Sequence, residues 1–189
     1  MKTLLLKNAN VVLPDREVKG GSVLIEEGSI VSLEAESAGE VLDLAGATLL
    51  PGFIDVHIHG AVGVDVMDAT ASDLLEVSEY LASQGVTSWV PTFVPASDEN
   101  YESAIAAISE AMNVGSGARV LGVHYEGPFV NTAQCGALHT EYFKTYAGVA
   151  DLNSLPLPSS GVRMITLAPE VTGGIELVRE LKRFTNSSS

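Results

Sequence analysis

Residues 51–60 read Pro51-Gly52-Phe53-Ile54-Asp55-Val56-His57-Ile58-His59-Gly60 and end a short apolar strand pattern in two histidines. The proline and glycine break the chain before this strand, and the glycine at its end allows a loop to leave it. Because successive strand side chains point to opposite faces, His57 and His59 share a face, with their backbone positions about 7 Å apart. Imidazole nitrogens arranged in this way can bind one metal ion. Taken alone, the pair is equally compatible with two ordinary histidines, so its interpretation depends on the surrounding chain.

A second strand pattern ends in a carboxylate. Apolar residues 120–123 lead into His124-Tyr125-Glu126-Gly127-Pro128-Phe129, where the Gly-Pro pair marks a turn. Glu126 is an oxygen donor that can bind a divalent cation or bridge two, and its ordinary interpretation is a solvated turn residue. His124 shares a face with Glu126, so it can orient a ligand or pack inside the sheet. The two motifs together form the candidate metal site of the chain.

The chain divides at about residue 50 into two patterns. Residues 1–50 hold short strand patterns separated by turn signals, which predicts a small antiparallel sheet or β-sandwich. Residues 51–189 alternate strands with amphipathic helices, which predicts a parallel sheet and the α/β class. We expect strands near residues 51–57, 86–93, 118–126 and 162–168, and helices near residues 71–84, 98–113, 140–149 and 173–184. Thr70 or Ser72 would cap the first of these helices, and Ser97 would cap the second.

Composition limits the partners and the location of the protein. The net charge of −14 argues against binding to nucleic acid or to an anionic membrane surface, because both require clustered basic residues. No apolar run approaches the roughly 18 residues of a membrane span, and the N-terminus lacks the pattern of an export signal, so we expect a cytoplasmic protein. The single Cys135 excludes an intrachain disulfide. We interpret it as a packed loop residue rather than a nucleophile, because no activating histidine motif surrounds it.

The first motif resembles the first barrel strand of the amidohydrolase superfamily, in which a His-x-His pair supplies two metal ligands. Residues 124–129 are similar to the His-x-Glu-Gly-Pro-Phe signature of the N-acetylglucosamine-6-phosphate deacetylase family. Residues 166–170, which read TLAPE, are similar to that family's next strand end, so three motifs occur in the family's order. The resemblance implies a (β/α)8 TIM barrel preceded by a small β domain. Such a barrel needs about 250 residues, so residues 51–189 would hold only about its first four β/α units.

The resemblance implies hydrolysis of N-acetylglucosamine 6-phosphate, a small amino sugar phosphate, to glucosamine 6-phosphate and acetate. It assigns one or two divalent ions to His57, His59 and Glu126, with zinc first and iron, manganese or cobalt as alternatives. The family's catalytic aspartate and two further histidine ligands would lie beyond residue 189. We therefore name no catalytic residue in this chain and expect it to be inactive alone. Asp55 is interpreted as orienting a ligand or capping the strand end.

The loop after Glu126 carries the candidate substrate contacts. Family members have a Gly-x-His sequence there that contacts the substrate, whereas this chain reads Gly136-Ala137-Leu138-His139, with one extra residue before the histidine. Either His139 keeps the contact in a shifted loop, or Leu138 takes that position. The backbone near Ala137 can contact the substrate in both cases.

Two other functions fit parts of the same sequence. Other amidohydrolases that cleave cyclic amides also begin with the first motif, but the His-x-Glu-Gly-Pro-Phe motif argues against them. A half-barrel that binds one ion without turnover is the non-enzymatic alternative. An incomplete barrel would leave a sheet edge and an apolar inner face uncovered, so we expect the isolated chain to form a homo-oligomer, to self-associate otherwise or to be poorly soluble.

Overall fold

The computed structural model describes residues 3–186 and divides into two compact units, Met1–Gly52 and Phe53–Ser189. The first unit contains a five-stranded sheet made of β1 (Thr3–Val12), β2 (Glu17–Glu26), β3 (Ser29–Ser32), β4 (Glu40–Asp43) and β5 (Thr48–Leu49). β1 and β2 pair antiparallel, as do β2 and β3. Its small core is formed by Ala9, Val11 and Val23.

The expectation of a wholly antiparallel first sheet is wrong for its last two strands. β4 and β5 both pair with β1 in the parallel direction. Short turns reverse the chain between β1, β2 and β3, and such connections give antiparallel neighbours. Residues 33–39 instead cross from β3, at one edge of the sheet, to the far side of β1, which lets β4 run in the same direction as β1.

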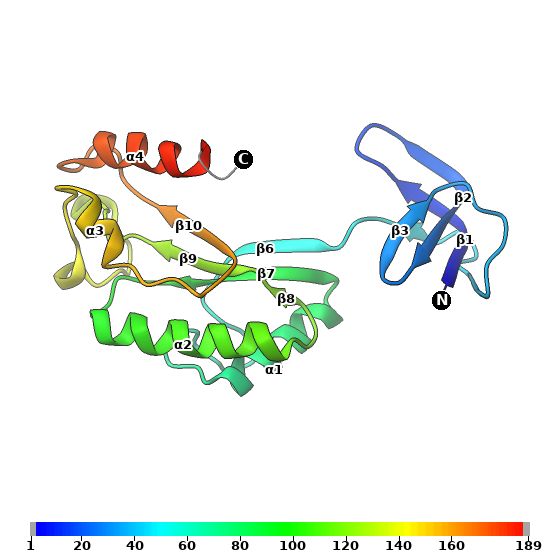
Figure 1. Ribbon diagram of the computed structural model, residues 1–189, viewed down its shortest axis with the longest axis horizontal. Helices are drawn as coiled ribbons and strands as arrows, with labels where there is room; N and C mark the ends of the chain where they lie inside the picture. The colour runs from blue at the N-terminus through cyan, green and yellow to red at the C-terminus, as the bar shows by residue number, and fades with distance from the viewer. Residues whose placement is uncertain (1–2, 187–189) are drawn as a thin grey trace. The chain divides into compact units, whose positions relative to one another are not determined.

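The second unit contains a parallel sheet with helices packed beside it (Figure 1). Its strands are β6 (Phe53–Ile58), β7 (Val86–Phe93), β8 (Arg119–Val120), β9 (Gly122–Glu126) and β10 (Val162–Thr166). Its helices are α1 (Ala71–Ser83), α2 (Asp98–Val114), α3 (Val149–Asn153) and α4 (Gly174–Asn186), with 3-10 helices η1 (Thr132–Gln134) and η2 (Thr140–Tyr142). The strand order is β10-β9-β7-β6, with β8 paired to β7, and every pairing is parallel. The expected α/β class is therefore confirmed.

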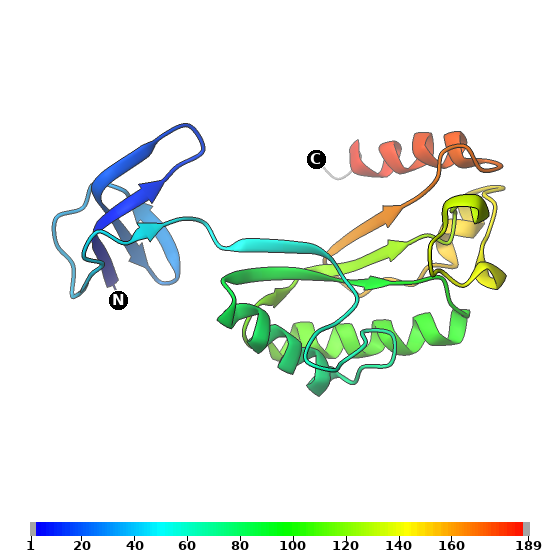
Figure 2. The ribbon, with the colours of Figure 1, turned by 180° about the vertical axis from the view of Figure 1, so that it is seen from behind.

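Helix boundaries follow local capping where the sequence supplies it. The Thr70 hydroxyl accepts from the backbone of Asp73, whose carboxylate accepts in return from the backbone of Thr70, so Thr70 rather than Ser72 caps α1. Ser97 caps α2 in the same position. Figures 1 and 2 show both helices along one face of the sheet. No helix within residues 3–186 is both long and apolar enough to cross a membrane.

The helix expected at residues 140–149 does not form. The structure has the short η2 at its start, and α3 begins only at Val149. Between them the backbone bonds to distant segments: the N–H of Lys144 donates to the Pro128 carbonyl, and that of Tyr146 to the Thr172 carbonyl. These long-range bonds use donors that a helix would need for itself.

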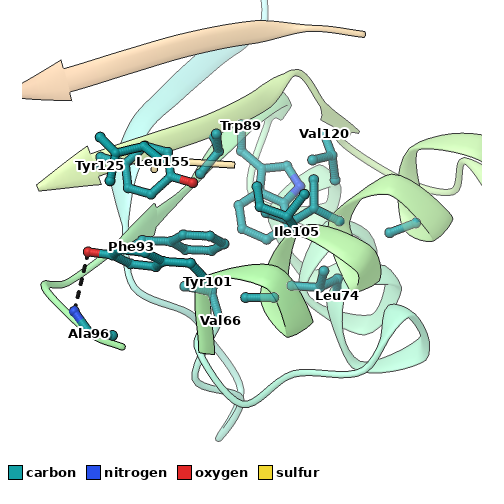
Figure 3. Packing of buried hydrophobic residues seen from close by; sticks show 14 of the residues in the cluster. Val66, Leu74, Trp89, Phe93, Ala96, Tyr101, Ile105, Val120, Tyr125 and Leu155 are labelled. Carbon is teal, nitrogen blue, oxygen red and sulfur yellow. Dashed lines mark hydrogen bonds between the residues drawn. The ribbon is translucent and has the colours of Figure 1, made fainter. Parts of the chain in front are cut away.

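Aromatic side chains hold the parallel sheet against α1 and α2 (Figure 3). Trp89 and Phe93 from β7 are fully buried, as are Tyr101 from α2 and Tyr125 from β9. The Trp89 indole donates to the Ser78 hydroxyl of α1 at 2.9 Å, and the rings of Tyr101 and Tyr125 meet edge to face, with their centroids 5.1 Å apart. This core fixes the carboxyl ends of β7 and β9, where Thr92 and Glu126 lie.

Candidate metal centre

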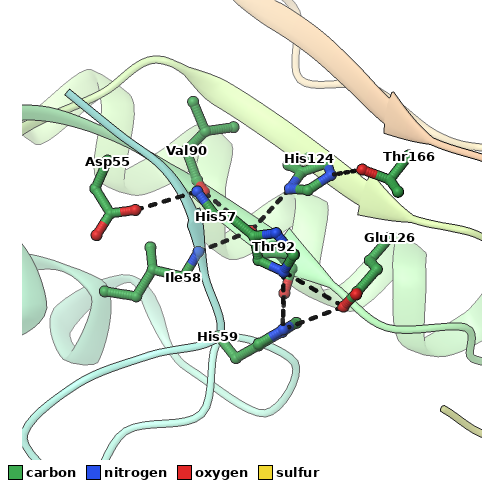
Figure 4. A network of polar contacts seen from close by, with 9 residues as sticks. All are labelled: Asp55, His57, Ile58, His59, Val90, Thr92, His124, Glu126 and Thr166. Atoms are coloured by element: carbon green, nitrogen blue, oxygen red, sulfur yellow. Dashed lines mark hydrogen bonds and ion pairs between the residues drawn. The ribbon is translucent and has the colours of Figure 1, made fainter. Parts of the chain in front are cut away.

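The predicted metal residues stand at the carboxyl ends of two strands that flank a third. His57 lies in β6 and His59 directly follows it, whereas Glu126 is the last residue of β9. β7 runs between these strands. Because all three strands are parallel, their carboxyl ends reach the same edge of the sheet, and the three side chains converge there (Figure 4).

The separations between the three side chains fit a shared divalent ion. His57 Nε2 lies 3.3 Å from His59 Nε2, and the Glu126 Oε2 atom lies 3.5 and 3.2 Å from these two nitrogens. Ligand atoms about 2.0–2.1 Å from a tetrahedral zinc ion are about 3.3–3.4 Å from one another. Two imidazole nitrogens and a carboxylate oxygen also form a donor set that zinc, iron, manganese and cobalt accept. The arrangement is therefore suited, in distance and in chemistry, to one ion.

Neighbouring groups form hydrogen bonds to the His59 ring and to the backbone of the histidine pair. The Thr92 carbonyl accepts a hydrogen bond from His59 Nδ1 at 3.1 Å, and the Thr92 hydroxyl accepts one from the backbone N–H of Ile58 at 2.9 Å. The Asp55 carboxylate accepts from the backbone N–H of His57 at 3.1 Å, so it bonds the backbone that carries a candidate ligand. Sequence reasoning identified Asp55 but missed Thr92, because a threonine within an apolar strand has no distinguishing pattern.

His124 lies beneath this cluster with both ring nitrogens engaged. It is fully buried, with Nδ1 3.1 Å from the Thr92 hydroxyl and Nε2 2.8 Å from the Thr166 hydroxyl. Burial lowers the pKa of His124, and the nearby His57 adds to this effect, while the Glu126 carboxylate opposes it. The structure therefore favours a neutral imidazole that packs beside the cluster.

The three predicted substrate contacts lie in different surroundings. Leu138 lines a cavity of about 220 Å³ that also includes Glu126. Ala137 and His139 are exposed and do not line this cavity, and the His139 ring instead lies beside Glu141, with 3.8 Å between Nδ1 and Oε1. The other lining residues are Val130, Asn131, Gln134, Cys135, Thr166, Leu167, Ala168 and Glu170. Cys135 thus packs in the loop, where its thiol lies 3.3 Å from the Thr132 carbonyl.

The parallel sheet and the cluster together define an α/β protein with a candidate metal centre, and comparison with known proteins shows the family to which it belongs. No protein-family model matches the chain. The N-acetylglucosamine-6-phosphate deacetylase of Bacillus subtilis (strain 168) is 35% identical over 191 residues, covering 96% of this chain and 48% of the relative. The N-acetylgalactosamine-6-phosphate deacetylase of Escherichia coli O157:H7 is 35% identical over 161 residues, covering 84% of this chain and 42% of the relative.

A solved structure agrees with these sequence matches. The crystal structure of N-acetylglucosamine-6-phosphate deacetylase from Thermotoga maritima matches with a TM-score of 0.75 and 32% identity, covering 95% of this chain and 46% of that one. The chain belongs to the N-acetylglucosamine-6-phosphate deacetylase family. It spans about half the length of the curated relatives it matches.

Proposed function

We propose that the whole protein hydrolyses N-acetylglucosamine 6-phosphate to glucosamine 6-phosphate and acetate, with a divalent ion bound by His57, His59 and Glu126. The observation that carries this proposal is the convergence of these three ligand atoms, within 4.8 Å of one another, in a chain homologous to deacetylases. Zinc is the first choice for the ion, with iron, manganese and cobalt as alternatives.

The residues of this chain would prepare the site for an amide substrate. A divalent ion bound there lowers the pKa of a bound water and polarises an amide carbonyl. His57 and His59 would offer neutral ring nitrogens, and Glu126 would supply a negative charge and a second oxygen able to reach a second ion. We assign the general base and acid to an aspartate outside this chain, so the 189-residue chain should bind metal without turnover.

We further propose that β6, β7, β9 and β10 are four consecutive strands of a (β/α)8 barrel. Each is followed by a helix, and β6 and β10 each have a free edge within the described sheet. Large apolar side chains are exposed on both edge strands, including Phe53 (61%), Ile54 (58%) and Val162 (50%). The rest of a barrel would cover such side chains, and in the isolated chain we expect self-association to cover them.

The cavity beside Glu126 is proposed to receive the amino sugar. Its lining includes the amides of Asn131 and Gln134 and the carboxylate of Glu170, and none of its lining residues is a lysine or an arginine. These groups suit hydroxyl and amide recognition and do not suit a phosphate, which we therefore assign to residues outside this chain. Leu138 is the lining residue that we propose as the substrate contact, with Ala137 and His139 as the further candidates from the sequence.

N-acetylgalactosamine 6-phosphate is a second candidate substrate. The Escherichia coli relative named for that sugar is 35% identical, as is the Bacillus subtilis relative.

A cytoplasmic location and the absence of nucleic-acid and membrane partners stay predictions from the sequence.

Acetate release tests the proposal. The 189-residue chain, loaded with zinc or cobalt, is compared with a fusion that adds the part of the Bacillus subtilis relative outside the match. Both N-acetylated sugar phosphates are supplied to each protein. We expect metal-dependent acetate release from the fusion alone. Turnover by the 189-residue chain would contradict the assignment of the base outside it, and a folded, metal-loaded fusion that releases no acetate would contradict the proposed function.

A further inference from the structure

We propose that Thr92 is a positioning residue that fixes both histidines of the metal site from the neighbouring strand β7. This inference rests on the metal site proposed above and adds to it a residue outside the ligand set. Thr92 is fully buried and lies on the strand that separates β6 from β9. Its backbone carbonyl contacts the His59 ring, and its hydroxyl contacts the backbone N–H of Ile58, the residue between the two histidines.

The carbonyl of Thr92 determines which ring nitrogen of His59 carries the hydrogen. Its oxygen lies 3.1 Å from His59 Nδ1, and a carbonyl oxygen can only accept a hydrogen bond. Nδ1 must therefore carry the hydrogen, which leaves the lone pair of a neutral ring on Nε2. Nε2 is the atom that lies 3.2 Å from Glu126 Oε2. The contact thus selects both the ring orientation and the tautomer that metal binding needs.

The hydroxyl of Thr92 holds the backbone between the two ligands. It accepts from the N–H of Ile58, the residue that separates His57 from His59, at 2.9 Å. The register between β6 and β7 shifts between Asp55 and Ile58, so the regular ladder is interrupted at this point. The side-chain bond therefore fixes the histidine pair where strand pairing alone constrains it least.

The same hydroxyl links β6, which carries the histidine pair, to His124 on β9. It lies 3.1 Å from His124 Nδ1, and His124 Nε2 lies 2.8 Å from the Thr166 hydroxyl on β10. Figure 4 shows Thr92 at the centre of these contacts, between His59 and His124. Both Thr92 and His124 are fully buried. Removing the hydroxyl would leave the buried His124 Nδ1 on β9 and the Ile58 N–H on β6 without this partner, and the backbone between the two histidines would lose this support.

Cobalt affinity of three variants of the 189-residue chain tests the inference. Thr92→Val removes the hydroxyl at nearly constant shape, and Thr92→Ser keeps it. Thr87→Val is the matched control, because Thr87 lies on the same strand and its hydroxyl bonds the Phe53 carbonyl of β6 at 3.3 Å, away from the cluster. Cobalt absorption titrations give the affinity and the ligand environment, and melting without metal reports the fold.

We expect T92V to bind cobalt about 10–100-fold more weakly, which is the usual effect of losing a group that orients a ligand. T92S and T87V should bind close to the wild-type affinity with an unchanged spectrum. A folded T92V with wild-type affinity would overturn the inference. If T92V fails to fold, Thr92→Ser and Thr92→Ala decide, because they differ only in the hydroxyl: equal affinities overturn the inference, and weaker binding by T92A supports it.

The wild-type titration separates this inference from the metal site itself. A wild-type chain that takes up no cobalt overturns the metal site and, with it, the role of Thr92. A wild-type chain that binds cobalt as tightly as T92V overturns the role of Thr92 alone.

Discussion

Replacing His57 and His59 together with asparagine should abolish the thermal stabilisation that a divalent ion gives to the second unit. The two imidazoles supply two of the three ligand atoms that lie within 4.8 Å of one another, and the double variant leaves only Glu126. Asparagine keeps a polar side chain of smaller size in both half-exposed positions, so the fold without metal should change little.

The size of the effect follows from mass action and from the size of the unit. At an ion concentration 100 times the dissociation constant, binding stabilises the folded state by about 2.7 kcal/mol. The unit Phe53–Ser189 has about 140 residues, which corresponds to an unfolding entropy of about 0.29 kcal/mol/K. The melting temperature of the wild-type unit should therefore rise by about 9 °C, and that of the double variant by less than about 1 °C at the same ion concentration.

Calorimetric melting with and without zinc or cobalt measures this difference. His139→Asn is the control, because the His139 side chain is 62% exposed and lies outside the ligand cluster, so this variant should keep the full rise. A double variant that keeps the wild-type rise would refute the reasoning, since the ion would then be bound elsewhere.

Three further predictions concern the core, alkaline pH and association. Ser78→Ala leaves the buried Trp89 indole N–H without its 2.9 Å partner and should lower the free energy of unfolding in urea by about 1–3 kcal/mol; a loss below about 0.5 kcal/mol would contradict this. Burial raises the pKa of Tyr101 to about 12, whereas the phenol of the unfolded chain ionises near pH 10. Between these pH values the folded chain keeps a proton that the unfolded chain loses. The free energy of unfolding should therefore fall as the pH rises from 10 to 12, by up to about 2.7 kcal/mol. Tyr101→Phe should flatten that decline in urea titrations, and an unchanged slope would exclude Tyr101 as its cause. Ile54→Lys on the edge strand should shift sedimentation towards monomer, whereas Ile30→Lys in the first unit should not.

Elements whose boundaries depend on neighbouring residues could be predicted from the sequence. The strand expected at residues 86–93 corresponds to β7, and the capping threonine and serine before α1 and α2 mark where those helices begin. The histidine pair and Glu126 could also be found, because each stands at the end of a recognisable strand pattern. Their convergence to within 4.8 Å follows once the strands are parallel and lie on either side of β7.

Features set by long-range pairing could not be predicted. The direction of β4 depends on a crossing to the far side of β1, and no residue in β4 itself encodes this. The segment after η2 resembles a helix locally, but its N–H groups bond to the carbonyls of Pro128 and Thr172. Thr92 acquires its proposed role only from the strand pairing that places it opposite His124 and beside β6.

If the histidine pair binds an ion as proposed, its position on an edge strand links metal binding to local unfolding. β6 has β7 as its only neighbour in the described sheet, and it exposes Phe53, Ile54 and Val56. Strands with few buried contacts open before the core does, and opening of β6 would carry both imidazoles away from Glu126 while the aromatic core stayed folded. A bound ion therefore adds its binding free energy to the cost of opening this one strand. The backbone amides of β6 should exchange their hydrogens more slowly when the ion is present, because the ion would hold an edge strand that has one neighbour in the described sheet.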